Sequence, residues 1–211
     1  MGNVFGDPAL SAFQQKKLLH EFHTFFDLNK DGTLEWKDFD LARKQVCEMS
    51  GWPVGSQRYT DTQSLFIELW RRLQDDGDSD CDGKITCEEW LKMWEKFNAN
   101  SEKEDKKDAK DKVSEEETTL RIPEWLERYI EYKFNLLDRA ADGHIDVDEF
   151  EYVISNFGVP AKDARSAFLM FSQGNQKKVD RKYFRELTAE FFRSDDPSSL
   201  GNFITGKLEF S

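Results

Sequence analysis

Cysteine, proline and long apolar runs are scarce in this sequence. Its 211 residues include 3 Cys and 5 Pro. The odd number of cysteines, Cys47, Cys81 and Cys87, has no framework spacing, which excludes a disulfide scaffold and predicts free thiols in a reducing compartment. We find no signal-peptide apolar region and no segment of membrane-spanning length. We therefore expect a cytoplasmic protein that does not insert stably into membranes.

Positive charge is also in deficit. The chain has 42 Asp and Glu against 30 Lys and Arg, a formal net charge of -12. This balance argues against binding to nucleic acid or anionic membranes. The 18 Phe and 6 Trp argue against a disordered acidic chain, because so much aromatic surface requires burial. We expect one or two small folded domains and a monomer.

The segment 78–89 matches the calcium-binding loop of an EF-hand at every diagnostic position. Gly83 at position 6 allows the sharp turn, Thr86 at position 9 can hold a water, and Glu89 at position 12 can close the site with two oxygens. These groups supply about seven oxygens, as Ca²⁺ prefers. The predicted ligands are Asp78, Asp80, Asp82, the carbonyl of Lys84, and Glu89.

The segment 27–38 is a second loop of the same kind, with Gly32 at the turn. Asp38 closes it in place of Glu and is one methylene shorter, so bidentate closure is harder. A loop closed in this way favours six oxygens and tolerates Mg²⁺. The predicted ligands are Asp27, Asn29, Asp31, the carbonyl of Thr33, and Asp38.

A third loop spans 138–149, and a fourth unit follows at 172–183. Ala140 offers no ligand at position 3 of the third loop, which leaves that site one oxygen short unless water substitutes. The predicted ligands there are Asp138, Asp142, the carbonyl of His144, Asp146 and Glu149. In the fourth loop Lys177 replaces the turn glycine and Tyr183 the closing acid, so we interpret this hand as a structural remnant.

Four repeated units with helical apolar spacing predict an all-α fold of four EF-hands in two pairs. We expect paired loops to form short two-strand contacts through Leu34 with Ile85 and Ile145 with Val179. The predicted boundaries are an N-terminal pair at 1–97, a charged linker at 98–121, and a C-terminal pair with a tail at 122–211. The linker lacks an apolar stripe, so we expect it to be mobile and its cleavage to leave two folded fragments.

The long spacing of the first two hands, the aromatic content, and the segments 88–94 (EEWLKMW) and 123–126 (PEWL) resemble the invertebrate sarcoplasmic calcium-binding protein and calexcitin family. The resemblance covers nearly the whole chain. It implies three working hands, a degenerate fourth, and a role in Ca²⁺ and Mg²⁺ buffering or in calcium signalling. Relatives implied by it include juvenile hormone diol kinase.

Three functions are open on these grounds. The first is a non-catalytic buffer or signal modulator, which we favour. The second is a sensor that exposes an apolar groove to a target protein; its 4 Met, scattered along the chain, do not favour it. The third is a nucleotide-dependent enzyme, since 201–207 (GNFITGK) has phosphate-loop spacing. That segment lacks the strand and helix context, and we expect it to pack Phe203, Ile204, Leu208 and Phe210 on the core.

The first residues, 1–6 (MGNVFG), begin like an N-myristoylation signal. Gly6 stands where Ser or Thr is expected, which disfavours acylation. Asp7 and Pro8 then predict the start of the first helix.

Overall fold

A computed structural model describes residues 10–111 and 120–210, with side chains placed in both ranges except at 102–111. The N-terminal acylation pattern and the Asp7–Pro8 cap lie outside these residues. Within them, the first helix begins after Ser11, whose side chain accepts a hydrogen bond from the backbone N–H of Gln14. A Ser in this position satisfies one of the free N–H groups at a helix start.

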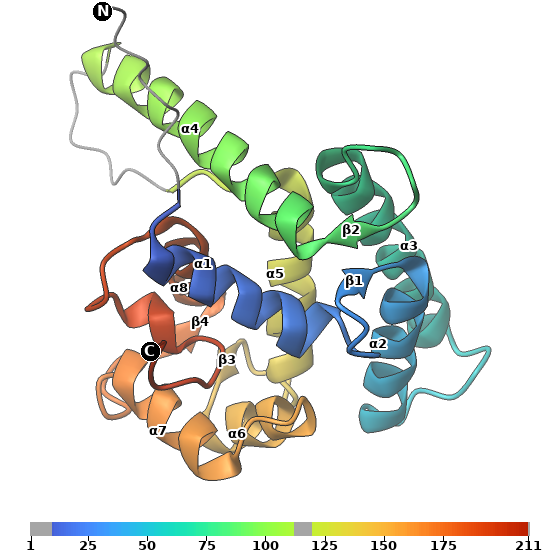
Figure 1. Cartoon of the computed structure of the whole chain (residues 1–211). Helices are drawn as coiled ribbons and strands as arrows, with labels where there is room; N and C mark the ends of the chain where they lie inside the picture. Colours follow the sequence, from blue (N-terminus) through green and yellow to red (C-terminus); the bar gives the residue numbers. More distant parts are fainter. Residues whose placement is uncertain (1–9, 112–119, 211) are drawn as a thin grey trace, which may run out of the picture.

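The helices and strands follow one another as four helix–loop–helix units (Figure 1). The first two units contain α1 (Ala12–Glu21), the π-helix η1 (Phe22–Phe26), β1 (Thr33–Leu34), α2 (Trp36–Met49), α3 (Gln57–Gly77), β2 (Ile85–Thr86) and α4 (Cys87–Asp111). The last two contain α5 (Glu124–Leu137), β3 (His144–Ile145), α6 (Val147–Asn156), α7 (Ala161–Phe171), β4 (Val179–Asp180), α8 (Arg181–Arg193) and the 3-10 helix η2 (Leu200–Phe203). The all-α prediction is confirmed.

The loops pair as predicted through two short antiparallel strand contacts. Leu34 in β1 lies opposite Ile85 in β2, and Ile145 in β3 lies opposite Val179 in β4. All four side chains are buried, because position 8 of each loop turns its apolar residue away from the loop ligands and into the core. Each strand pair therefore fixes two loops side by side.

Part of the charged segment predicted as a linker is helical. Residues 98–111 continue α4, which projects from the body of the molecule in Figure 1. Ala99 and Ser101 are still buried, so the packed part of α4 extends into the segment interpreted as linker. A helix already nucleated by packing needs little further stabilisation to continue through Glu, Lys and Ala, which are good helix formers.

One hydrophobic core runs through both halves of the chain. Phe26 packs against Tyr129 with ring centroids 5.0 Å apart, and Trp90 against Trp125 at 6.0 Å. Trp94 stacks on Phe192 at 4.7 Å. Each of these contacts joins the first pair of hands to the second. The boundary between two domains at 98–121 therefore remains a prediction. The shared core favours one body that unfolds cooperatively.

The segment 201–207 has the environment of a packed tail. It follows α8 through η2, and the N–H of Gly201 donates to the Glu190 carboxylate at 2.7 Å instead of lining an anion site. Ile204 is buried, and Phe203 packs at the edge of the core. Leu208, expected on the core, is 38% exposed. Neither a preceding strand nor a following helix flanks this segment within residues 120–210, so it lacks the geometry of a phosphate loop.

Candidate metal centres

The four loops share one backbone feature. The residue at position 4 has a positive φ in every loop: Lys30 (59°), Cys81 (61°), Ala141 (56°) and Asn175 (65°). The turn glycines at position 6 of the first three loops also have positive φ, between 82° and 86°. Lys177 occupies this position in the fourth loop. Because a residue with a Cβ rarely adopts such angles, the glycines are what allow three of the loops to curl around a common centre.

The carboxylates at positions 1 and 12 organise the first three loops in the same way. The position 1 carboxylate accepts from the N–H groups of positions 5 and 6, between 3.0 and 3.1 Å, in all three loops. The position 12 carboxylate accepts from the N–H of position 9 at 3.0 Å, and from position 2 or 3 across the loop. Hydrogen bonds thus close each loop between its two terminal acids.

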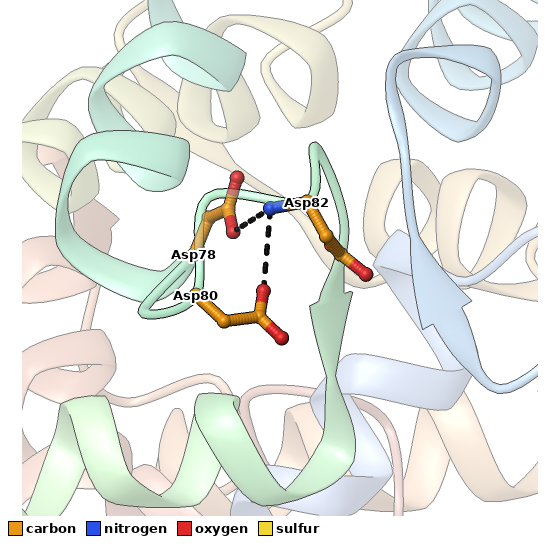
Figure 2. Close-up of side chains that lie close together, drawn as sticks. All are labelled: Asp78, Asp80 and Asp82. Carbon is orange, nitrogen blue, oxygen red and sulfur yellow. Dashed lines mark hydrogen bonds between the residues drawn. The ribbon is translucent and has the colours of Figure 1, made fainter.

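The second loop brings Asp78, Asp80 and Asp82 together, as Figure 2 shows. One carboxylate oxygen from each lies within 4.8 Å of the others. The N–H of Asp82 donates to both Asp78 and Asp80, at 3.1 and 3.2 Å, which holds them on one side of the loop. Three hard oxygen donors gathered around one point suit a divalent cation such as Ca²⁺.

Glu89 closes this second loop. Its carboxylate accepts hydrogen bonds from the N–H and hydroxyl of both Ser79 and Thr86, between 2.8 and 3.1 Å. Burial alone would raise the pKa of Glu89, but these hydrogen bonds outweigh it and lower the pKa to about 2. The closing acid is therefore held as a carboxylate, the form that binds a metal ion.

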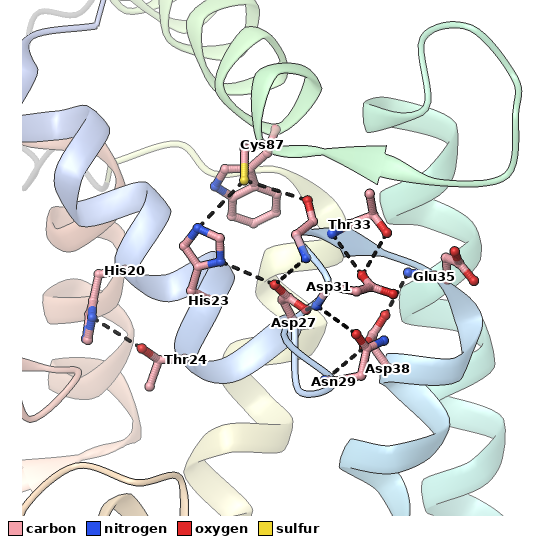
Figure 3. A network of polar contacts seen from close by, with 12 residues as sticks. His20, His23, Thr24, Asp27, Asn29, Asp31, Thr33, Glu35, Asp38 and Cys87 are labelled. Atoms are coloured by element: carbon pink, nitrogen blue, oxygen red, sulfur yellow. Dashed lines mark hydrogen bonds and ion pairs between the residues drawn. The ribbon is translucent and has the colours of Figure 1, made fainter.

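The first loop places Asp27 and Asp38 in the interior and Asp31 at the surface (Figure 3). Asp38 reaches both sides of the loop despite its short side chain: Oδ1 accepts from Asn29 Nδ2 at 2.6 Å, and Oδ2 from the Glu35 N–H at 3.0 Å. Burial raises the pKa of Asp38. The ammonium of Lys37 lies 2.7 Å from Asp31 Oδ2 and, together with Thr33, lowers the pKa of Asp31 to about 2.

The third loop retains both terminal acids, although Ala140 at position 3 has no side-chain ligand. The N–H of Ala140 donates to Glu149 Oε1 at 2.8 Å, so the residue without a ligand still helps to close the loop. Asp146 caps α6 by accepting from the N–H groups of Asp148 and Glu149. The His144 ring lies 3.7 Å from Asp142 Oδ1. Four carboxylates and one carbonyl thus remain available to a cation.

The fourth loop has a different interior. Ser172 is buried and accepts from the N–H of Asn175 at 3.1 Å. Asp180 caps α8 by accepting from the N–H of Tyr183 at 2.8 Å. The ammonium of Lys177 lies 3.8 Å from the centre of the Tyr183 ring, where a closing acid would stand. A positive charge in place of a closing acid disfavours a metal ion, so we keep the interpretation of this hand as a structural remnant.

Several residues around the first loop were not foreseen from the sequence. Lys37 pairs with a predicted ligand, and Lys84 of the second loop reaches Glu35 of the first at 2.9 Å. His23 Nδ1 lies 3.3 Å from Asp27 Oδ2, and Cys87 Sγ lies 3.7 Å from His23 Nε2. The i,i+4 spacing of His23 and Asp27 on a helix was a usable signal. The contact with Cys87 depends on how two hands pack and has no local signature.

Comparison with known proteins gives a consistent set of relatives. The chain is 27% identical over 198 residues to sarcoplasmic calcium-binding proteins I, III and IV of Branchiostoma lanceolatum, covering 94% of this chain and 98% of theirs. It is 27% identical over 212 residues to calexcitin-1 of Caenorhabditis elegans, covering 94% and 88%. Its homologues are sarcoplasmic calcium-binding proteins and calexcitin.

The fold agrees with this homology. The structure of an amphioxus sarcoplasmic calcium-binding protein superimposes with a TM-score of 0.75 at 24% identity, covering 95% of this chain and all of that one. Calcium-loaded apo-aequorin from Aequorea victoria aligns less closely, with a TM-score of 0.59 at 13% identity. No protein-family model matches the chain. The resemblance inferred from the sequence is thus confirmed, and the EF-hand fold with it.

Proposed function

We propose that this protein binds Ca²⁺ at three loops, which begin at Asp27, Asp78 and Asp138, and acts as a cytoplasmic, monomeric Ca²⁺ and Mg²⁺ buffer or calcium signal modulator. The main support is the hydrogen-bond network that closes these three loops between their first and last acids. The fourth loop has neither acid. The names of the homologues, all calcium-binding proteins or calexcitin, support the same ligand.

The packing of the hands favours a buffer over a groove-forming sensor. A sensor exposes an apolar groove when its helices separate on binding Ca²⁺. Here the apolar faces of the two pairs cover each other through Trp90, Trp94, Trp125 and Phe192. Trp90, Trp94, Trp125 and Phe192 are each at most 2% exposed. Opening a hand would require separation of this shared core, so we expect little change in exposed apolar surface on binding.

Within residues 10–111 and 120–210, no helix combines the length and apolar character needed to cross a bilayer. We propose no catalytic role, and we expect purified protein to show no nucleotide turnover. Measurable turnover lost on Lys207→Ala would support the enzyme alternative instead.

Native mass spectrometry with calorimetric Ca²⁺ titration tests the number of sites. We expect three ions per chain, and one fewer after Glu89→Gln or Glu149→Gln, because each substitution removes a closing carboxylate. Asp180→Ala is the matched control, since it alters an acid of the fourth loop and should leave the count at three. A fourth ion that is lost in the Asp180→Ala variant would contradict the proposal.

A further inference from the structure

A thiol and an imidazole from different hands meet beside the first loop (Figure 3). Cys87 is the first residue of α4, and His23 lies in η1, which leads into the first loop. Cys87 Sγ lies 3.7 Å from His23 Nε2 and 3.8 Å from the Gly32 carbonyl oxygen. His23 Nδ1 lies 3.3 Å from Asp27 Oδ2. Sulfur, nitrogen and oxygen donors thus converge at the surface between β1 and α4.

The orientation of His23 suits a metal ligand. Its Nδ1 faces a carboxylate, which favours the tautomer with the proton on Nδ1 and leaves the Nε2 lone pair free toward Cys87. Histidines that bind metals usually donate their second ring N–H to a carboxylate in this way. Asp27 supplies the carboxylate here, held by its hydrogen bonds from Asp31 and Gly32.

The distance between Cys87 Sγ and His23 Nε2 also fits a shared zinc ion. Zinc bonds of about 2.3 Å to sulfur and about 2.0–2.1 Å to nitrogen, at a tetrahedral angle, place the two donor atoms about 3.6 Å apart. The observed distance of 3.7 Å needs almost no rearrangement. His23 is 50% exposed, so an ion can reach the site from solvent.

We propose that Cys87 and His23 bind Zn²⁺ between the first two hands, with the Gly32 carbonyl and water completing the coordination. This site goes beyond the proposed calcium binding and does not depend on it. A thiolate and an imidazole select a borderline-soft ion such as Zn²⁺ over Ca²⁺, which takes hard oxygen ligands. On binding, Cys87 forms the zinc–sulfur bond and its S–H proton leaves to solvent.

Zinc binds cysteine as the thiolate, so binding at Cys87 releases one proton to solvent.

The shared contact with Asp27 couples this site to the first calcium loop. Asp27 would bind Ca²⁺ directly while accepting a hydrogen bond from the zinc-bound imidazole. Two divalent cations on either side of one carboxylate repel each other, so we expect Zn²⁺ to weaken Ca²⁺ binding at the first loop by about threefold to tenfold. Ca²⁺ must weaken Zn²⁺ binding by the same factor.

Co²⁺ added to the calcium-saturated, reduced full-length protein tests the site, because thiolate ligation to Co²⁺ gives a charge-transfer absorption in the near ultraviolet. We expect one equivalent to develop this band and Zn²⁺ to abolish it. Cys87→Ser should remove the band, and His23→Gln should weaken Co²⁺ binding by at least about tenfold. Cys81→Ser is the matched control and should leave the band unchanged.

Circular dichroism and Ca²⁺ stoichiometry show whether each variant is folded, and they report on the calcium proposal separately. A band that survives Cys87→Ser, or no band at all in folded wild-type protein, would overturn the zinc site. The coupling is tested by Ca²⁺ titration of the first loop with and without Zn²⁺. An unchanged Ca²⁺ affinity in the zinc-bound protein would refute the link through Asp27.

Discussion

We expect Asp38→Glu to make the first loop, which we propose as a mixed Ca²⁺/Mg²⁺ site, selective for calcium. Asp38 is fully buried and already uses both oxygens within the loop, toward Asn29 and Glu35. An added methylene would let the carboxylate offer both oxygens to one ion, as we expect for Glu89 in the second loop. Ca²⁺ accepts the extra ligand, whereas Mg²⁺ requires six ligands at shorter distances.

The structure has room for the longer side chain. A cavity of about 30 Å³ borders Asp38 among the rings of Phe25, Phe39 and Tyr129. This exceeds the roughly 10–15 Å³ that a single water-sized probe needs, which leaves room for one methylene group. The overpacking cost of about 1–3 kcal/mol is therefore largely avoided. A charge-assisted contact is worth about 1 kcal/mol more than a neutral one, so the Ca²⁺/Mg²⁺ affinity ratio should rise about fivefold to tenfold.

The assay isolates the first loop in a Glu89→Gln, Glu149→Gln background and titrates Ca²⁺ with and without millimolar Mg²⁺. The reciprocal variant Glu89→Asp, made with the other two loops disabled, is the matched control and should make the second loop more tolerant of Mg²⁺. If both affinity ratios stay within twofold of wild type, position 12 does not set selectivity here and the reasoning is wrong.

Three further predictions concern charge, pH and chain continuity. Lys37→Gln should raise Ca²⁺ affinity at the first loop by up to about fivefold, because it frees Asp31 from an exposed ion pair. The same gain in Lys84→Gln, which removes equal charge, would point to long-range charge instead. Burial, then Lys207 and other nearby cations, lowers the pKa of His20 to about 4, below its unfolded value of about 6.5. Stability is therefore lost as pH falls from 6.5 toward 4. Between pH 7 and pH 5, the free energy of unfolding measured with urea should fall by about 1–2 kcal/mol less in His20→Gln than in wild type. An equal fall in both proteins would contradict this. After cleavage at a protease site inserted within 112–119, the two halves should elute together in size-exclusion chromatography, because the shared core holds them. Two separately folded fragments would instead support the division predicted from the sequence.

The fold was predictable where the sequence repeats a local rule. The loops were placed by the spacing of acids around Gly32, Gly83 and Gly143, and each spacing fixes both the turn and the entry and exit of its helices. The strand register followed from position 8, where a β-branched or leucine side chain stands in every loop. Such rules need no knowledge of distant contacts, and the structure reproduces them residue by residue.

What could not be predicted depends on packing between units. Hydrophobic periodicity gave no reason to continue α4 beyond residue 97, because that signal requires an apolar stripe and the sequence of this segment has none. Lys37 in α2 pairs with Asp31 in the loop before it. The sequence spacing does not determine which nearby acid this lysine contacts. The proximity of Cys87 and His23 arises only when the second hand docks on the first.

The same docking links the first loop to the second half of the chain. The π-helix η1 ends at Phe26, directly before Asp27, and Phe26 packs on Tyr129 of α5. Nearby, the buried carboxylate of Glu21 accepts from the Tyr129 hydroxyl at 3.2 Å and from the Lys133 ammonium at 3.3 Å. Helix α5 itself ends at the third loop. A cation bound at the first loop would act through this packing on the helix that positions the third, so we expect the proposed first and third calcium sites to belong to one mechanical unit.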